Sequence, residues 1–442
     1  MDATTLTPIK PRTGFHYFPD DRHYRESDLQ AWLPELRSLG AAWIVLNAPI
    51  DRAIPEQFIR GLKNAEVEPI LHFGMSLAEP PNVHDLTVLL ESYAKWGVKY
   101  VVFFDRPNSR SAWSVTTWVQ EDLIERFLDR YLPLAETALQ CGLIPVFPPL
   151  EPGGNYWDTS FLKGVLQSLQ RRKATTLLER LVLSAYTWNG EHSLNWGAGG
   201  PERWPGARPY FTPVTEEDQR GFRIFDWYLA ISRAVLGRSL PIVLLGVGAP
   251  LDPSVAATPV EDPANHAEQN LTIARLMAGE TIIEAGTEDT ELDAIPEEVL
   301  ACNYWLLAAQ PETPFQDQAW FQSNGQSLPV VGVFRQWVAS HEKAKGAKKS
   351  PEQEQHPIDH YLLLPAYDWG IADWHLDIIR PYVKKYRPTI GFSLEEAEYA
   401  RQVTVIGDAA SEDEIDHLRA VGCLVEWIDG DGTIIATSLA ER

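Results

Sequence analysis

The stretch Ala42-Trp-Ile-Val-Leu-Asn47 shows the pattern that decides the fold of this chain. A short, almost wholly apolar run of this kind suits a β-strand that is buried on both faces, as the strands of a parallel sheet are. An amphipathic helical stretch follows at residues 55–65, and the next apolar run comes at residues 69–73. This alternation predicts βα units around a parallel sheet.

The same succession recurs along the chain up to about residue 340. The predicted strands cover residues 14–18, 42–47, 69–73, 100–104, 144–147, 181–186, 241–245 and 300–307. Helical periodicity covers residues 27–39, 55–65, 83–96, 116–141, 221–236 and 266–278. Eight βα units in about 320 residues match the size of a (β/α)8 TIM barrel. An open, doubly wound sheet is the alternative, and the lack of a G-x-G-x-x-G after the first strand argues against it.

A charged segment of low hydrophobicity separates this barrel from a smaller unit. We predict a barrel over residues 12–340, a linker over 341–356 and a small α/β domain over 357–442. In the small domain we expect strands at 361–364 and 403–406 and helices at 373–385, 395–399 and 412–420. The segments 424–428 and 433–437 are expected to form a closing hairpin around Asp429-Gly430-Asp431-Gly432. A calcium loop is disfavoured there because the later Glu and the ligand spacing are missing.

Composition excludes several classes of partner. The 442 residues carry a formal net charge of -23, which argues against nucleic acid and against an anionic membrane surface. No apolar stretch approaches the roughly 20 residues that span a bilayer, and residues 1–19 lack the apolar run of a signal peptide. Cys141, Cys302 and Cys423 lie far apart, which fits a reducing compartment. We therefore expect a soluble, cytoplasmic, bacterial protein.

Polar and aromatic side chains follow the predicted strands at the face where barrel chemistry is found. Such a mixture suits a saccharide, because aromatic faces stack on sugar rings and polar groups bind hydroxyls. The alternative is that each polar side chain merely satisfies loop backbone groups. The residues are His16, Asp20, Asn47, His72, Asp105, Arg106, Asn108, Glu151, Tyr186, Trp188, Glu191, Asn303 and Trp305.

Two of these strand regions resemble a known group of enzymes. The segment GVKYVVFFDRPNSRSAWS, residues 97–114, resembles the strand-four region of clan A glycoside hydrolases, where the strand commonly ends in Asn-Glu-Pro and that Glu is the acid/base. The segment ACNYWL, residues 301–306, is similar to their eighth strand, where a Trp often forms the floor of the sugar subsite. The order of elements agrees over residues 14–340, about three quarters of the chain. The resemblance implies a glycoside-hydrolase barrel that recognises an oligosaccharide or glycoconjugate.

The chain departs from that family at both catalytic positions. Asp105-Arg106-Pro107 stands in place of Asn-Glu-Pro, and Val247 stands where strand seven would supply the nucleophilic Glu. Arg stays protonated and Val has no titratable group, so neither residue can replace a carboxylate in the usual mechanism. If the alignment holds, that mechanism is absent.

Other carboxylates offer a substitute. Glu151 follows the fifth predicted strand directly, and Asp105 lies one strand away. Neighbouring strand ends can provide the gap of about 6.5–9.5 Å that an inverting pair needs, with Glu151 as the acid and Asp105 as the base. Arg106 would favour the ionised form of Asp105. The alternative is that Glu151 only binds sugar hydroxyls or pairs with Arg106.

The long loop at residues 188–210 carries Trp188, Trp196 and Trp204 among Gly, Pro and charged residues. Loops this long and aromatic are usually functional, so it either walls a glycan cleft or packs down as a cap or partner surface.

His16, His72 and Asp20 could together ligate a metal ion, but the indication is weak because the H-x-H motif of barrel metal hydrolases is missing. We expect no metal and no cofactor.

Three hypotheses follow for the function. The first is an active hydrolase led by Glu151 and Asp105. The second is a catalytically inactive protein that binds glycan through Trp305, Tyr186 and Trp188. The third is a scaffold in which the barrel is only architecture and the C-terminal domain is the active part.

Overall fold

The computed structural model describes residues 11–189, 192–204, 220–248, 262–284, 290–322, 325–346, 356–366 and 373–440. The chain divides into two compact units, Met1–His341 and Glu342–Arg442. Among the helices within the described ranges, none is both long and apolar enough to cross a lipid bilayer.

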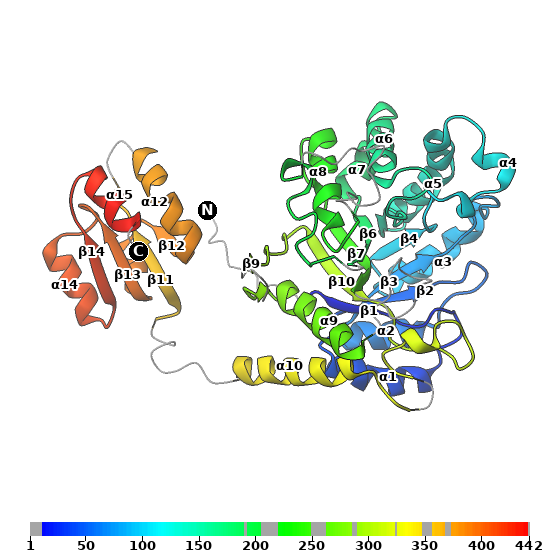
Figure 1. Ribbon diagram of the computed structural model, residues 1–442, viewed down its shortest axis with the longest axis horizontal. Coiled ribbons are helices and arrows are strands. Elements are labelled where there is room, and N and C mark those ends of the chain that lie inside the picture. Colours follow the sequence, from blue (N-terminus) through cyan, green and yellow to red (C-terminus); the bar gives the residue numbers. More distant parts are fainter. Residues whose placement is uncertain are drawn as a thin grey trace. The chain divides into compact units, whose positions relative to one another are not determined.

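The first unit is a barrel of parallel strands (Figure 1). Its strands pair in the order β5-β4-β3-β2-β1-β10-β7-β6. A parallel bridge between Val146 and Val182 joins the two ends of this sheet, and the Phe147 N–H donates to the Val182 carbonyl at 2.7 Å. The predicted (β/α)8 barrel is therefore confirmed. Its strands are β1 Thr13–His16, β2 Trp43–Asn47, β3 Glu68–Phe73, β4 Tyr100–Phe103, β5 Ile144–Val146, β6 Leu183–Trp188, β7 Ile242–Gly248 and β10 Val299–Tyr304.

Helices surround the strands, as Figure 1 shows. Some of them begin after a residue whose side chain caps the helix; before α3, for example, the side chain of Asn82 accepts a hydrogen bond from the His84 N–H. The helical pattern predicted over residues 116–141 is two helices, α4 and α5. The helices are α1 Glu26–Ser38, α2 Glu56–Asn64, α3 Val83–Lys95, α4 Val115–Trp118, α5 Leu123–Gln140, α6 Asp158–Arg171, α7 Thr175–Arg180, α8 Ile224–Leu236, α9 Pro263–Met277 and α10 Pro329–Gly346.

Shorter elements complete the barrel loops. A small antiparallel pair, β8 Ile283–Glu284 and β9 Thr290–Glu291, lies between α9 and β10. Single 3-10 turns occupy Arg110–Ala112, Gly200–Glu202 and Gln316–Gln318.

Side chains inside the barrel form an apolar cluster of their own. Val45, Ile70, Val102, Val243 and Leu245 belong to it, and all come from strands. Because side chains alternate between the two faces of a strand, the next interior positions after Val45 and Ile70 are two residues further along. The apolar interior therefore leads directly into the polar residues at the strand ends.

The second unit is a small α/β domain, as predicted. Its strands are all parallel and pair in the order β12-β11-β13-β14. Separate apolar clusters include Ile415 of α14 and Ile435 of α15. The elements are β11 Ile358–Leu363, α12 Asp373–Tyr386, β12 Thr389–Gly391, α13 Leu394–Ala397, β13 Ala400–Ile406, α14 Glu412–Ala420, β14 Leu424–Ile428 and α15 Gly432–Ala440.

The predicted closing hairpin is wrong. Within the described residues β14 pairs with β13 alone, and residues 433–437 lie in helix α15. Asp431 explains the difference, because its Oδ1 accepts hydrogen bonds from the N–H groups of Thr433 and Ile434 at 2.9 and 3.0 Å. The side chain caps a helix where we expected a turn residue.

The predicted linker also overlaps a helix. α10 ends at Gly346, so residues 341–346 are helical. Residues 347–355 lie outside the described residues.

Barrel closure should be sensitive to Gly14 of β1. A Cβ placed there would lie 2.3 Å from Asn303 Oδ1 and 2.6 Å from Trp43 Cβ, on the two neighbouring strands. We expect Gly14→Ala to lower the free energy of unfolding by about 1–3 kcal/mol, because overpacking displaces neighbouring strands. Urea denaturation followed by tryptophan fluorescence measures this change. The matched control is Gly332→Ala on α10, where a Cβ has nothing within 4 Å; equal loss in both variants would contradict the prediction.

Candidate functional site

The ends of β4 and β5 bring Asp105, Arg106 and Glu151 together. The Arg106 Nε atom lies 3.2 Å from Glu151 Oε2 and 3.7 Å from Asp105 Oδ2. All three side chains are between 37% and 40% exposed, so solutes can reach them. One cation thus pairs with both carboxylates that we predicted to be catalytic.

The backbone of this turn is unusual. Arg106 has a φ of 46° and Phe104 a φ of 68°, in the left-handed region that residues with a Cβ rarely adopt. The Arg106 N–H donates to the Pro149 carbonyl at 3.0 Å, which ties the end of β4 to the loop after β5. Backbone conformations of this kind persist only where the surrounding contacts impose them.

Tyr186 of β6 joins the group from the next strand. Its hydroxyl donates to Asp105 Oδ1 at 2.7 Å, and the Arg106 guanidinium lies 4.8 Å from its ring centroid. Trp188 stacks with Tyr186 at 5.9 Å between ring centroids and 11° between planes. Burial and the nearby Asp105 carboxylate raise the pKa of Tyr186 well above its ordinary value, so its hydroxyl stays a donor.

The neighbours of Arg106 keep its guanidinium charged. Burial lowers the pKa of this guanidinium, but Tyr186, Asp105 and Glu151 outweigh that effect and raise the pKa above its ordinary value. Arg106 therefore remains a cation over the pH range in which carboxylates and histidines titrate.

Gly246 of β7 makes room for the aromatic stack. A Cβ there would lie 2.6 Å from Trp188 Cη2 and 2.7 Å from Tyr186 Cδ1. The pairing of β6 with β7 shifts at this point, since Ala185 pairs with Leu244 and Tyr186 with Gly246. Beyond this bulge, Val247 is buried in the apolar cluster outside the barrel interior. The position that we aligned with a nucleophile thus packs in the core.

Asn108 holds the loop that carries Glu151. Its Nδ2 donates to the carbonyls of Glu151 and Tyr156 at 2.8 and 2.9 Å, and its Oδ1 accepts from the Glu151 N–H at 2.8 Å. The side chain is fully buried. We predicted Asn108 as a substrate contact, whereas these bonds commit it to positioning Glu151.

A second buried group, Asp158, fixes the same loop and was missed in the sequence analysis. Its Oδ1 accepts from the Gly153 N–H and its Oδ2 from the Tyr228 hydroxyl, both at 2.9 Å. Burial raises the pKa of this carboxyl, and these hydrogen bonds oppose that rise. The only signal in the sequence was an acidic residue in the first turn of α6.

His16 and His72 lie in the buried part of the barrel mouth. His16 Nε2 contacts the Leu245 carbonyl, and His72 Nε2 contacts the Phe104 carbonyl at 2.9 Å. A ring nitrogen that faces a carbonyl carries the proton, so Nε2 of each ring is a donor rather than a metal ligand. In the part of the chain that the structure describes, no group of three His, Cys, Asp or Glu side chains is arranged to hold a metal ion.

Asn303, Trp305 and Asn47 also lie at the strand ends. The Asn303 Nδ2 donates to the Leu244 carbonyl at 2.9 Å, and this side chain is fully buried. Trp305 is half-buried; its Nε1 donates to Gln318 Oε1 at 2.5 Å, and its ring meets His16 edge-on at 4.8 Å. The Asn47 Nδ2 donates to the Phe18 carbonyl at 3.1 Å. Of these three, Trp305 and Asn47 are partly exposed and Asn303 is not.

Asp20 lies in a separate hollow between the β1 and β10 loops. Its Oδ2 is 3.5 Å from His23 Nε2, which in turn contacts Gln310. The hollow measures about 970 Å³, and its lining includes Asp20, His23, Arg25, Asp28 and Gln310. Asp105 and Glu151 follow β4 and β5, which lie across the barrel from β1 and β10.

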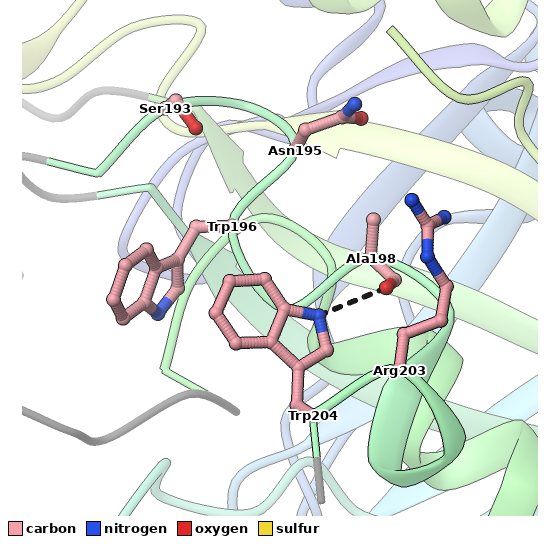
Figure 2. Close-up of a pocket in the computed structure, with 6 residues that line it drawn as sticks. All are labelled: Ser193, Asn195, Trp196, Ala198, Arg203 and Trp204. Atoms are coloured by element: carbon pink, nitrogen blue, oxygen red, sulfur yellow. Dashed lines mark hydrogen bonds between the residues drawn. The ribbon is translucent and has the colours of Figure 1, made fainter.

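Trp196 and Trp204 line another hollow in the β6–α8 loop, which Figure 2 shows. Their ring centroids are 5.0 Å apart, and the Trp204 Nε1 donates to the Ala198 carbonyl at 3.0 Å. Glu191, the remaining predicted contact of this loop, lies outside the described residues.

Comparison with known proteins gives structural similarity only. No family model matches the chain, and no curated protein matches it. Similar solved structures include the GH39 enzyme from Xanthomonas axonopodis pv. citri, at 14% identity over 75% of this chain and 67% of that chain, with a TM-score of 0.47. A monomeric β-xylosidase from Caulobacter crescentus CB15 aligns at 12% identity over 74% of this chain and 68% of that chain, with a TM-score of 0.46. The β-galactosidase from the psychrophilic Marinomonas ef1 aligns at 10% identity over 94% and 75%, with a TM-score of 0.42. Because these values are low, the barrel architecture rests on the strand order of this chain.

Removing the Asn108 side chain should loosen the Glu151 loop. Asn108→Ala leaves the Glu151 N–H and two carbonyls without their partner, so we expect a loss of about 1–3 kcal/mol in the free energy of unfolding. Hydrogen exchange of the Glu151 amide should become faster. Asn155→Ala in the same loop is the control, since Asn155 Oδ1 accepts only from the Arg110 N–H at an exposed position. Unchanged exchange at Glu151 in Asn108→Ala would refute the positioning role.

The buried His16 should make stability depend on pH. Burial, with a smaller contribution from His72, lowers the pKa of His16 from 6.5 to about 3. As the pH falls through this interval, the unfolded chain binds a proton that the folded chain does not, so the free energy of unfolding falls. His16→Asn should make that fall less steep in urea titrations at several pH values. The same substitution at the exposed His84 is the control, and an unaltered slope in His16→Asn would contradict the assignment.

Proposed function

We propose that this protein recognises a saccharide at the carboxyl-end face of its barrel, through Asp105, Arg106 and Glu151 together with Tyr186 and Trp188. The single observation that carries the proposal is the contact of one guanidinium with two carboxylates and an aromatic stack at neighbouring strand ends. Carboxylate oxygens accept hydrogen bonds from sugar hydroxyls, and guanidinium N–H groups donate to them. Stacked aromatic rings supply the apolar surface on which a sugar ring packs.

The ion pairs favour binding over proton transfer. A glutamic acid that protonates a leaving group must be free of its cation at that moment, whereas Glu151 is paired with Arg106. A sugar hydroxyl, by contrast, can bond to the pair as it stands. We therefore propose saccharide binding as the first candidate function, ahead of hydrolysis.

Hydrolysis is the second candidate, and one observation favours it. Each of the two carboxylates approaches the same Arg106 nitrogen, so their nearest oxygens lie at most about 7 Å apart. This limit admits the separation of about 5–5.5 Å of a retaining pair as well as the short end of the range of about 6.5–9.5 Å that belongs to the inverting mechanism we predicted. In that mechanism Glu151 donates the proton to the leaving group and Asp105 activates a water. Arg106 must then turn away from Glu151 when substrate binds.

One experiment separates the two candidates. The wild-type protein is incubated with a panel of oligosaccharides at mildly acidic to neutral pH; mass spectrometry detects cleavage, and calorimetry measures binding. We expect binding of at least one member without products. Trp188→Ala should weaken that binding by about threefold to tenfold, because it removes one stacking face.

Glu151→Gln tests the roles of the carboxylate. If the protein binds saccharide without cleaving it, Glu151→Gln alters the affinity, and neither the wild type nor the variant forms product. Product in the wild type and none in Glu151→Gln would establish hydrolysis as the function. Product from both would remove Glu151 from catalysis. Binding of no oligosaccharide by the folded wild type would overturn the whole proposal and leave the barrel as a scaffold.

A further inference from the structure

The hollow in the β6–α8 loop presents two indole rings. Trp196 and Trp204 meet at 53° between their planes, and His192 stacks on Trp196 at 4.3 Å with 8° between planes. The hollow has a volume of about 330 Å³, enough for about one sugar ring. Its other lining residues are Ser193, Asn195, Ala198 and Arg203, as Figure 2 shows.

Buried bonds hold this loop in place before any ligand arrives. Arg223 is almost fully buried and donates to the carbonyls of Leu194 and Ala294 at 3.3 and 3.2 Å. The Gly199 N–H donates to Asp226 Oδ2 at 2.9 Å, and the Trp227 Nε1 donates to the Gly197 carbonyl at 3.0 Å. A surface that is already ordered loses little conformational entropy on binding.

The hollow adjoins the loop that carries Glu151. A Cβ placed at Gly221 would lie 3.2 Å from Trp196 Cδ1, so residue 221 lies against that indole. The preceding residue, Arg220, has its Cδ 3.1 Å from a Cβ placed at Gly153, which follows Glu151 by two positions. Residues 220 and 221 therefore lie between the hollow and the Glu151 loop, and the Arg220 side chain makes the contact with Gly153.

The polar groups of the hollow suit the binding of a ligand and not catalysis. The Asn195 side chain is committed, since its Nδ2 donates to the Glu291 carbonyl at 3.3 Å and its Oδ1 accepts from the Asp293 N–H at 3.0 Å. Arg203 pairs with Asp293 and retains further N–H groups for an acceptor. None of the lining residues is a carboxylic acid. The lining of the hollow thus presents indole surface and a cationic side chain.

We propose that this hollow is an outlying subsite, which takes a further sugar unit of the same saccharide that binds at Asp105, Arg106 and Glu151. The inference rests on the proposed function and adds the size of the ligand: an oligosaccharide, whose units beyond the first reach the tryptophans. The indole surfaces of Trp196 and Trp204 that line the hollow contact that outlying unit.

The test is the dependence of affinity on chain length. The probes are β-1,4-linked xylose, glucose and mannose series and a β-1,4-linked galactose series, each from one to six units, titrated into the full-length protein by calorimetry. We expect affinity to rise as units are added, and Trp196→Ala to reduce the affinity for the longer members by about threefold to tenfold while leaving the shortest binding member unchanged. Trp196→Phe keeps an aromatic face and should retain most of the gain.

The control is Trp96→Ala, which removes a half-buried indole at the carboxyl end of α3. Helices of a barrel run opposite to its strands, so this residue lies at the face away from the site. It should keep the full dependence on chain length. Thermal unfolding of each variant establishes that it is folded; if Trp196→Ala is not, the comparison of Trp196→Phe with the wild type decides.

The outcomes are distinguishable. A rise with chain length that disappears in Trp196→Ala and persists in Trp96→Ala supports the subsite. A rise that persists in Trp196→Ala, or no rise beyond the shortest binding member, overturns the subsite and leaves the proposed function standing. Binding of no member by the wild type overturns both.

Discussion

The structure depends on the closure of one parallel sheet. The Val146–Val182 bridge joins β5 to the start of β6 and so completes the cycle of strands. Because all strands run in the same direction, every carboxyl end then lies at one rim. Asp105 and Tyr186 are 81 positions apart in the chain, yet closure places them in hydrogen-bond contact. Asp105 and Tyr186 can meet because the closed sheet has no free edge between β5 and β6.

Arg106 is the centre of that site, and its position follows from backbone contacts. Its N–H bond to Pro149 and its left-handed φ aim the side chain between two loops. From there the guanidinium pairs with Glu151 and Asp105 and lies over the ring of Tyr186. A carboxylic acid at this place would put three acids around one point, where like charges repel. An arginine instead places N–H donors beside two carboxylates that accept hydrogen bonds, so the cluster carries both kinds of group.

The strands of the barrel were predictable because their burial leaves a clear apolar signal. β2 Trp43–Asn47 and β3 Glu68–Phe73 lie within one residue of the predicted ranges. Helix α6 could have been found too, since Phe161, Leu162, Val165, Leu166 and Leu169 repeat with helical spacing. The helix α15 was missed because Asp431 serves equally well in a turn or as a helix cap, and only its bonds to Thr433 and Ile434 decide.

The site was harder to predict than the fold. Sequence placed Asp105, Arg106, Glu151 and Tyr186 at strand ends, and they do meet there. It could not show that the bulge at Gly246 turns Val247 toward the outer core, since a shift in pairing leaves no mark in composition. Nor could it separate side chains that contact a ligand from those that contact the backbone.

Asn108 and Asp158 are two buried side chains that fix the loop carrying Glu151. Burying an amide and a carboxylate is costly unless their hydrogen bonds are made. Asn108 bonds to backbone groups of the loop that carries Glu151, and Asp158 accepts from the Gly153 N–H of that loop and from the Tyr228 hydroxyl of α8. A glutamate that served only as a surface ion-pair partner would gain little from this, since exposed pairs tolerate a range of geometries. Asn108 fixes both the N–H and the carbonyl of Glu151, so the direction in which its side chain leaves the backbone is set from two sides. The fold therefore supports an aimed carboxylate, and an aimed carboxylate is needed where the partner is a ligand with hydroxyls in fixed positions.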